Sequence, residues 1–418
     1  MRIERIGDGG DPADVLRALA DLAVERGTPA PAALIGDWFG SRAVLAPSVR
    51  TAPVGTASTF DLSNRGAVTV PGRAAARGDD GPVIGGGWIG YLGYPDTPTS
   101  GATAALPAAA GGWTDSVLRQ DPGGCWWYES LTDDPCPAAW SDAVTAPNAP
   151  ARPWRIEWTA PNRDAHRRGV QECLEAIRQG EVYQACVCTQ FRGLADGDPL
   201  HFFADAVAAT RPARAAFVQG EWGAVASLSP ELFLSRHDDL LRSSPIKGTL
   251  PIADDPDRLR ASIKDVAENV MIVDLVRNDL GRVAVPGSVT VTDLLGVYPA
   301  PGVWHLVSTV AATAATGTTT AELLDATFPP ASVTGCPKHR ARQLLSEWEP
   351  DHRGVYCGAV GFASPLAGTE LNVAIRTVEF DPSGNAVLGV GGGITIDSDP
   401  DAEWQECLDK ASSIISLG

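Results

Sequence analysis

A proline-rich segment near the middle of the chain constrains the possible folds more than any other feature. Four prolines lie between Thr145 and Asn162, and the apolar residues among them form no long run. Proline lacks a backbone N–H and interrupts helices and sheets, so this composition predicts a linker or a boundary between two lobes. The chain has 418 residues, enough for such a division. We therefore expect a β-rich first lobe over residues 1–150 and a second lobe over residues 151–418.

The two predicted lobes differ in their residue patterns. In the first, short apolar runs between glycines and prolines favour strands at Ala33–Ile35, Ala43–Leu45, Gly87–Leu92 and Cys125–Tyr128. The second alternates helical and strand patterns. Its predicted helices are Arg163–Gln179, Asp255–Leu280 with Gly281 as the stop, Thr320–Phe328, Pro337–Glu347 and Pro400–Leu417. Its predicted strands are Ala185–Phe191, Ala216–Phe233 with a turn inside, Gly354–Ala363, Glu370–Phe380 and Ala386–Ile396.

The charge balance excludes some classes of partner. Acidic residues outnumber basic ones by 51 to 33, which gives a formal charge of −18. Nucleic acids and anionic membranes bind basic patches, so we expect neither as a partner. An anionic substrate would need a local cationic pocket or a divalent metal. The first residues lack the apolar run of a signal peptide, and none of the eight cysteines forms a C-x2-C pair, so we expect a cytoplasmic protein with reduced thiols and no zinc site.

The long predicted helix carries two lines of residues at helical spacing. One line is apolar and predicts the core face; its members are Leu259, Ile263, Val266, Val270 and Val273. The other line contains Asp265, Glu268, Ile272 and Leu275. A carboxylate aligned with aliphatic residues is unfavourable unless it is paired, hydrogen-bonded or bound to a metal.

The last predicted helix repeats this arrangement. Glu403, Glu406 and Lys410 share a narrow arc that runs beside the apolar Cys407. Two interpretations are open for each helix: a structural ion pair, such as Glu406 with Lys410, or a set of oxygen ligands for magnesium. For Glu268, the structural alternative is a salt bridge with Arg277 or Arg282.

Glycines and cations offer further candidates. Gly391–Gly393 exposes backbone amides that suit an anion, although a flexible turn is the alternative. Thr334 or Gly335 could cap a helix with Pro337 in its first turn, which would place an anion site, or only a capped start, at that terminus.

Three basic residues lie in largely uncharged surroundings. Lys247 is either a nucleophile or a surface lysine. Arg376, inside an apolar strand pattern, needs a partner, either a substrate carboxylate or a neighbouring acid. His305 is either functional or a satisfied core residue.

Taken together, these sequence strings resemble the chorismate-utilising enzymes. The matching strings are Gly180–Gln184, Ser227–Glu231, Pro245–Thr249, Ala267–Gly281, His305–Ser308, Thr334–Lys338, Ala374–Thr377, Gly391–Gly393 and Ala402–Glu406. They cover the second half in the family's order, whereas the first half matches loosely through Gly85–Tyr94 and Trp127–Ser130. The resemblance implies a two-lobed α+β fold like that of anthranilate synthase component I, with central antiparallel sheets, helices outside and a cleft in the second lobe.

Two positions discriminate among the family's reactions. Members that add water to chorismate carry a lysine where this chain has Gln184, and anthranilate synthases carry alanine where it has Lys247. Lysine at position 247 resembles the aminodeoxychorismate synthase component I branch. The resemblance thus implies amination of chorismate to 4-amino-4-deoxychorismate, toward p-aminobenzoate and folate, with ammonia from a glutamine amidotransferase subunit. The alternatives are an anthranilate synthase component I, or a non-catalytic scaffold for a glutaminase.

The resemblance also assigns roles at the predicted metal site. Glu268 and Glu406 would bind Mg2+ directly, while Asp265 and Glu403 would act through waters. Lys410 would add positive charge beside them.

The remaining roles concern the substrate. Gly391, Gly392 and Gly393 would hold the ring carboxylate together with the metal, and Arg376 would pair with the enolpyruvyl carboxylate. Lys247 would attack the ring, Glu231 would protonate the departing hydroxyl, and His305 would orient the ring. Gln184 and Thr334 would contact the substrate. Five residues depart from the family's usual pattern near the pocket, where we expect them to affect the fit of the substrate: Cys186, Pro330, Ala331, Cys336 and Val390.

Overall fold

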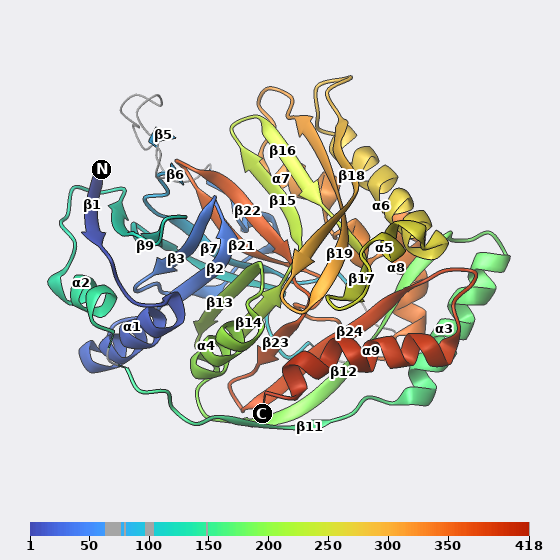
Figure 1. Ribbon diagram of the computed structural model, residues 1–418, viewed down its shortest axis with the longest axis horizontal. Helices are drawn as coiled ribbons and strands as arrows, with labels where there is room; N and C mark the ends of the chain where they lie inside the picture. Colours follow the sequence, from blue (N-terminus) through green and yellow to red (C-terminus); the bar gives the residue numbers. More distant parts are fainter. Residues whose placement is uncertain (63–76, 79–80, 97–103, 148, 418) are drawn as a thin grey trace.

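The computed structural model describes residues 1–62, 77–78, 81–96, 104–147 and 149–417. Two large antiparallel sheets form its centre, and most helices lie on the outside (Figure 1). The helices are α1 (Pro12–Arg26), α2 (Ala138–Thr145), α3 (Arg163–Arg178), α4 (Pro199–Thr210), α5 (Asp257–Ala261), α6 (Ile263–Gly281), α7 (Thr320–Thr327), α8 (Lys338–Trp348) and α9 (Pro400–Ile415), with 3-10 turns η1 (Thr56–Ser58) and η2 (Ala331–Val333). No helix in the described ranges is both long and apolar enough to cross a membrane.

The first sheet has its strands in the order β1-β10-β9-β3-β2-β13-β14-β23-β24-β12-β11, with β20 beside β12. Their bounds are β1 (Arg2–Gly7), β10 (Trp126–Ser130), β9 (Ser116–Gln120), β3 (Ser41–Ala46), β2 (Ala32–Trp38), β13 (Arg214–Gly220), β14 (Gly223–Ser229), β23 (Thr377–Phe380), β24 (Asn385–Ile394), β12 (Gln184–Asp196), β11 (Arg155–Thr159) and β20 (Gly335–Cys336). Helices α3 and α9 contact each other and pack on this sheet, at β12 and β24.

The second sheet has the order β17-β19-β16-β15-β22-β21-β7-β8-β4, with β18 beside β19. Its strands are β17 (Ile246–Pro251), β19 (Val303–Thr313), β16 (Leu240–Ser244), β15 (Leu232–His237), β22 (Gly368–Val373), β21 (Ala359–Ser364), β7 (Gly87–Leu92), β8 (Ala109–Thr114), β4 (Ala52–Pro53) and β18 (Thr290–Ala300). A short hairpin, β5 (Arg77–Gly78) and β6 (Gly81–Pro82), stands apart. Helix α6 packs against β17 and β19.

Both sheets draw strands from either side of residue 150. In the first sheet β2 pairs with β13, and in the second β7 pairs with β21. The proline-rich segment itself contains β11, which pairs with β12. The two lobes predicted at this segment are therefore joined by backbone hydrogen bonds in both sheets, and their boundary stays a prediction.

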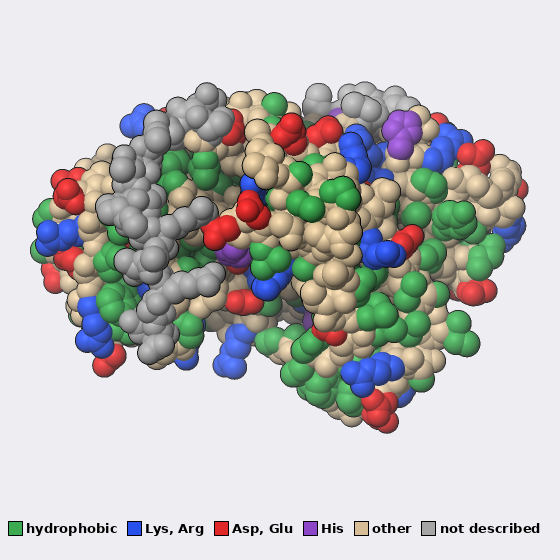
Figure 2. All heavy atoms as spheres, turned by 90° about the horizontal axis from the view of Figure 1, so that it is seen from above, with side chains coloured by type: hydrophobic (Ala, Val, Ile, Leu, Met, Phe, Trp, Pro, Cys, Tyr) green, Lys and Arg blue, Asp and Glu red, His purple; other side chains and the backbone are tan. Residues whose placement is uncertain are grey.

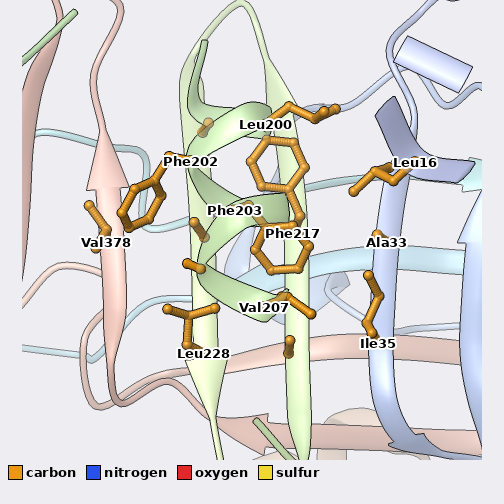
Figure 3. Close-up of a cluster of buried hydrophobic side chains, with 14 of the residues drawn as sticks. Leu16, Ala33, Ile35, Leu200, Phe202, Phe203, Val207, Phe217, Leu228 and Val378 are labelled. Atoms are coloured by element: carbon orange, nitrogen blue, oxygen red, sulfur yellow. The ribbon is translucent and has the colours of Figure 1, made fainter. Parts of the chain in front are cut away.

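Aromatic side chains fill the core between the first sheet and helix α4. Phe203 packs on Phe217 with ring centroids 5.2 Å apart, and Phe202 faces Phe380 and Val378 (Figure 3). Burying a side chain of this size stabilises the fold by about 1.5–3 kcal/mol. On the outer surface, acidic and basic side chains are interspersed over the face shown in Figure 2.

The predicted helix over Asp255–Leu280 is wrong in one respect, because it is interrupted. Ser262 takes an extended conformation, and its hydroxyl accepts a hydrogen bond from the N–H of Asp265, so α6 begins afresh at Ile263. The predicted core face is correct only in part: Leu259 and Val273 are buried, whereas Ile263 is 88% exposed and Val270 is 44% exposed. The inward face of α6 also carries Glu268 and Ile272.

Two predicted strands are also shorter than expected. Residues 354–358 form a turn before β21, so the strand begins only at Ala359. The strand predicted over Glu370–Phe380 is divided into β22 and β23, which belong to different sheets. Arg376 lies at this crossing with φ 51°, so it is not inside a strand.

Candidate active site

A run of three glycines on β24 lies at the centre of the candidate site. Gly391–Gly393 pairs with Cys186–Cys188 of β12, so the run lies inside the sheet, and the alternative of a flexible turn is wrong. A methyl group on the middle glycine would lie 2.9 Å from Glu403 Oε2, and one on the last glycine would lie 3.1 Å from Lys247 Nζ. Any larger residue would therefore push charged side chains away from the strand.

Three glutamates from helices α6 and α9 converge on this glycine run, and each faces a lysine. The pairs and their N···O distances are Glu268–Lys247 at 3.8 Å, Glu403–Lys264 at 2.9 Å and Glu406–Lys410 at 2.6 Å. Lys410 also donates to the carbonyl of Gly391 at 2.8 Å. The arginines offered as partners of Glu268 pair elsewhere, Arg277 with Asp274 and Arg282 with Asp325.

The carboxylates have the donor chemistry that magnesium requires. Glu268 Oε1 and Glu403 Oε2 are buried and have no hydrogen-bond partner in the described part of the chain. Across those residues, no three His, Cys, Asp or Glu side chains by themselves form a metal-binding group. Magnesium commonly takes only one or two protein carboxylates, with water and substrate oxygens completing its octahedron. The residues present therefore fit this ion.

Electrostatics differ between two of these glutamates. Burial raises the pKa of Glu268 despite the attraction of Lys247. Burial acts in the same direction on Glu406, but the ammonium of Lys410 outweighs it and lowers the pKa of that carboxyl. A cation near both would favour the charged form of each.

Arg376 contributes a further cation, close enough to His305 to act on the pKa of that ring. Its backbone carbonyl accepts a hydrogen bond from Leu228 N, which fixes the crossing between the sheets. Among the described residues no hydrogen bond or ion pair involves its guanidinium and no acid acts on its pKa, so the alternative of a neighbouring acid is not realised there. Burial lowers the pKa of Arg376. A carboxylate ligand would satisfy this group.

Lys247 and Gln184 face the same glycine. The Lys247 side chain is largely buried, so it is not a surface lysine. Gln184 is fully buried, and neither its amide nitrogen nor its amide oxygen has a partner among the described residues. A methyl group on Gly393 would lie 3.5 Å from Gln184 Oε1. Buried amides without partners are rare, which points to a polar ligand here.

Glu231 follows β14 and is only 3% exposed. Burial raises its pKa to about 7, although the Ser332 hydroxyl, Lys247 and the backbone of Ile246 act in the opposite direction. A carboxyl with this pKa keeps a proton in a substantial fraction of molecules at neutral pH.

His305 lies on β19 with its ring buried. Its Nδ1 shares a hydrogen bond of 2.9 Å with Thr249 Oγ1, whereas Nε2 has no partner in the described ranges. Burial, together with the nearby Arg376, lowers the pKa of His305 to about 4, so the ring is neutral at pH 7. It is therefore not a fully satisfied core histidine.

Two predicted site residues adjoin this cluster. Asp265 packs against Gly248, the residue after Lys247. Thr334 is buried: its hydroxyl donates to the carbonyl of Pro330 at 2.9 Å, and its own carbonyl accepts from the N–H of Cys186, which pairs with Gly393. The predicted cap by Thr334 or Gly335 is wrong, because α8 begins at Lys338 with Pro337 as its N-cap and no side-chain cap. The anion site at this terminus stays a prediction.

Several residues that position the glutamates could not be predicted from the sequence. Lys264 and Ser398 both hold Glu403, with the hydroxyl donating at 2.6 Å. Asn269 binds the carbonyl of Leu306 and the hydroxyl of Ser308, which ties α6 to β19. Only Lys264 left a signal, since it lies one helical turn before Glu268.

The residues that depart from the family pattern surround the site. Cys186 and Cys188 lie on the strand that pairs with the glycine run, and their Sγ atoms are 3.9 Å apart. Cys336 pairs with Gln184 across β20 and β12. Val390 lies on β24 and pairs with Thr189. Pro330 and Ala331 line a small cavity next to Glu231.

Comparison with known sequences identifies similar proteins. Residues 60–416 match the family described as chorismate binding enzyme. Aminodeoxychorismate synthase component 1 of Klebsiella aerogenes is 40% identical over 292 residues, 68% of this chain and 64% of that protein. Anthranilate synthase component 1 of Streptomyces coelicolor is 35% identical over 297 residues, 69% of this chain and 58% of that protein. The chain thus spans less than two thirds of the length of these curated relatives.

Solved structures share the fold. Anthranilate synthase component I of Streptococcus pneumoniae superposes with a TM-score of 0.70 at 22% identity, over 99% of this chain and 92% of that one. The menaquinone-specific isochorismate synthase of Escherichia coli gives 0.72 at 19% identity, over 100% and 94%. The expected α+β fold of the anthranilate synthase component I type is confirmed.

Proposed function

Because this chain belongs to the family of chorismate-binding enzymes, we propose that it aminates chorismate to 4-amino-4-deoxychorismate, as an aminodeoxychorismate synthase component I. The observation that carries the proposal is the position of Lys247. Its buried amine lies beside Glu268 and the glycine run, within the electrostatic reach of Glu231. An amine so placed can act as a nucleophile on a bound ring.

The reaction has two displacements on the ring. The neutral amine of Lys247 forms a bond to a ring carbon while the hydroxyl departs, and Glu231 gives that hydroxyl its proton, so water is released. Ammonia then forms a bond to the carbon that bore the hydroxyl, and the bond to Lys247 breaks. Lys247 leaves as the neutral amine that attacked, and the ammonia that replaces it loses one proton, which balances the one given by Glu231. The net change is chorismate plus ammonia to product plus water.

Other residues bind and orient the substrate. The unpartnered guanidinium of Arg376 would pair with one carboxylate, and the amides of Gly391–Gly393 would approach the other. Magnesium held by oxygens of Glu268 and Glu406 would supply positive charge for that second carboxylate. The neutral ring of His305 presents its free Nε2 as one more polar contact.

The named relatives are components of two-part enzymes, and we propose the same arrangement here. Ammonia would come from a glutamine amidotransferase subunit, and the product would lead toward p-aminobenzoate and folate. A second candidate is anthranilate synthesis, which the 35% identity to the Streptomyces coelicolor enzyme favours.

A product assay separates these candidates. The purified chain is incubated with chorismate, magnesium and an ammonium salt, with and without an aminodeoxychorismate lyase. We expect p-aminobenzoate only with the lyase, and a loss of at least a hundredfold in Lys247→Ala. Arg178→Ala, which alters an exposed helix residue paired with Glu175, serves as the control and should retain full activity. Anthranilate without lyase would identify the second candidate, and no turnover even with the amidotransferase subunit would favour a scaffold.

A further inference from the structure

A small cavity lies beside Glu231. The centre of a water molecule can move within about 10 Å³ there. Its polar lining comes from Glu231, Ser243, Asp279, Thr327 and Ser332, and its apolar lining includes Val276 and Leu280. A space of this size with several polar partners is sufficient for one buried water.

The cavity ends at a buried ion pair that binds no substrate in the mechanism above. Lys338 Nζ, on α8, donates to Asp279 Oδ2 at 2.6 Å and to the carbonyl of Thr327 at 2.8 Å. The side chain of Asp279, on α6, is 9% exposed and that of Lys338 is 15% exposed. The partly exposed Lys338 side chain therefore lies between solvent and a set of cavity-lining polar groups that includes Asp279 and Glu231.

We propose that these groups form a proton path through which Glu231 recovers its proton from solvent. The inference rests on the proposed role of Glu231 as the acid that protonates the departing hydroxyl. After that transfer, the Glu231 carboxylate takes a proton from the cavity water. Lys338 gives a proton to the Asp279 carboxylate, which passes it to the water, and the Lys338 amine takes a proton from solvent. Each group ends in its starting state: Glu231 as the acid, Asp279 as the carboxylate and Lys338 as the ammonium.

The geometry and the electrostatics support this direction of transfer. Glu231 is almost fully buried, and a substrate held over the glycine run would cover it further, so a second route to solvent serves turnover. Burial raises the pKa of Asp279 and lowers that of Lys338, although each group opposes the shift of the other. Both shifts reduce the free energy needed to move a proton from the ammonium to the carboxylate. The alternative is that the pair serves only to fasten α6 to α8.

Filling the cavity tests the path without altering any charge. Ser243→Val adds apolar volume where the water would lie, whereas Ser244→Val, on the other face of β16, is the matched control. Ser244 binds Thr309 Oγ1 at 3.0 Å, away from the cavity lining. Chorismate consumption is measured in H2O and D2O, with melting temperatures as the check of folding.

We expect Ser243→Val to lower kcat at least tenfold with KM unchanged, and to enlarge the solvent isotope effect, because proton supply then limits turnover. Ser244→Val should leave both values near those of the wild type. A folded Ser243→Val protein with wild-type kcat and isotope effect would overturn the proposal.

A second variant covers the case in which Ser243→Val does not fold. Asp279→Asn keeps the shape of the side chain but cannot carry the proton, so the same loss of kcat and the same change in isotope effect are expected. Lower melting temperature with unchanged kcat would assign the pair to fastening alone and overturn the path. Because the experiment measures chorismate consumption, it tests the proton path whichever product is formed. An unexpected product contradicts only the proposed function, and a wild-type chain that consumes no chorismate contradicts both.

Discussion

Two buried charged networks adjoin strand β12, and they differ in how completely their polar atoms are satisfied. In one, Arg353 donates to both oxygens of Glu349 and to the carbonyls of Val333 and Cys186 at 2.6–2.8 Å. Glu349 in turn accepts from the N–H of Cys188. In the other network, around the glycine run, several buried atoms have no partner among the described residues: Glu268 Oε1, Glu403 Oε2, His305 Nε2 and both polar atoms of the Gln184 amide.

This difference separates structural charge from charge that awaits a ligand. A buried ion pair with every donor satisfied gains nothing from a further ligand, whereas unpaired buried atoms carry a desolvation penalty of about 1–3 kcal/mol each. A substrate or metal ion that supplies the missing partners recovers this free energy on binding. The comparison therefore predicts opposite responses to substitution in the two networks.

The largest effect is expected from breaking the satisfied network. Arg353→Met leaves the Glu349 carboxylate buried without its partner, which should lower the free energy of unfolding by about 3–5 kcal/mol. Urea denaturation followed by circular dichroism measures this change. Replacing both residues by apolar ones of similar volume should restore much of the loss. A small change in Arg353→Met would mean that the two networks do not differ as described.

The unsatisfied network should lose activity rather than stability. Glu268→Gln removes a buried charge whose ion pair with Lys247 is long, at 3.8 Å, and whose pKa burial raises despite Lys247 and Lys264. Because the fold does not favour this charge, the free energy of unfolding should stay within about 1 kcal/mol of the wild type. Amination should fall at least a hundredfold, which corresponds to about 2.7 kcal/mol. Parallel denaturation and rate measurements check both parts. A loss of stability like that of Arg353→Met would instead make Glu268 structural.

The sequence pattern predicts the two helices that carry the carboxylates, but it does not predict correctly which residues of α6 face the core. The pattern placed Glu268 and Ile272 on one line, and both are buried. The same pattern predicts a buried Ile263, because it continues one helix through Ser262. In the structure the Ser262 side chain accepts a hydrogen bond from the N–H of Asp265, and a new helix begins there. Only the local backbone geometry at that serine reveals the restart.

The sequence pattern also does not predict contacts between distant residues, or where the chain passes from one sheet to the other. The apolar pattern around Arg376 predicts one strand, yet the chain there passes from the second sheet to the first. The contact between Lys264 and Glu403 joins residues far apart in the sequence, so neither helix alone could predict it. What the sequence predicts well is therefore the chemistry of each element, whereas tertiary packing decides which charges meet.

A smaller effect, dependent on pH, comes from Glu231. Its pKa of about 7 means that the protonated acid is lost as pH rises through 7, so kcat should fall about fivefold from pH 7 to pH 8, about tenfold for each further unit, and level off below pH 6. Stability should fall as pH rises from about 4.5, the ordinary pKa of this carboxyl, to about 7 and change little above that, because the folded chain holds this proton more tightly than the unfolded one.

Glu379 provides the matched control for this pH dependence. Burial also raises its pKa to about 7, but its carboxylate binds only the N–H groups of Val355 and Tyr356 among the contacts that the structure describes. Glu379→Gln should leave the kcat–pH profile unchanged, whereas Glu231→Gln should abolish it together with most activity. A profile that responds to Glu379 would place the titrating group outside the candidate site.

The smallest effect tests whether the lysines compete with a metal for the glutamates. Lys264, which is half-exposed, pairs with Glu403 at 2.9 Å, and Ser398 holds the same carboxylate. Lys264→Met removes a positive charge near the predicted magnesium site while Ser398 keeps Glu403 in place. Because like charges repel, magnesium should bind a few-fold more tightly, a gain of about 0.5–1 kcal/mol.

Calorimetric titration with magnesium measures the change, and Arg178→Met is the control for loss of an exposed charge. Weaker binding in Lys264→Met would mean that the lysine orients Glu403, so the pair would belong with the structural network on the other side of the comparison.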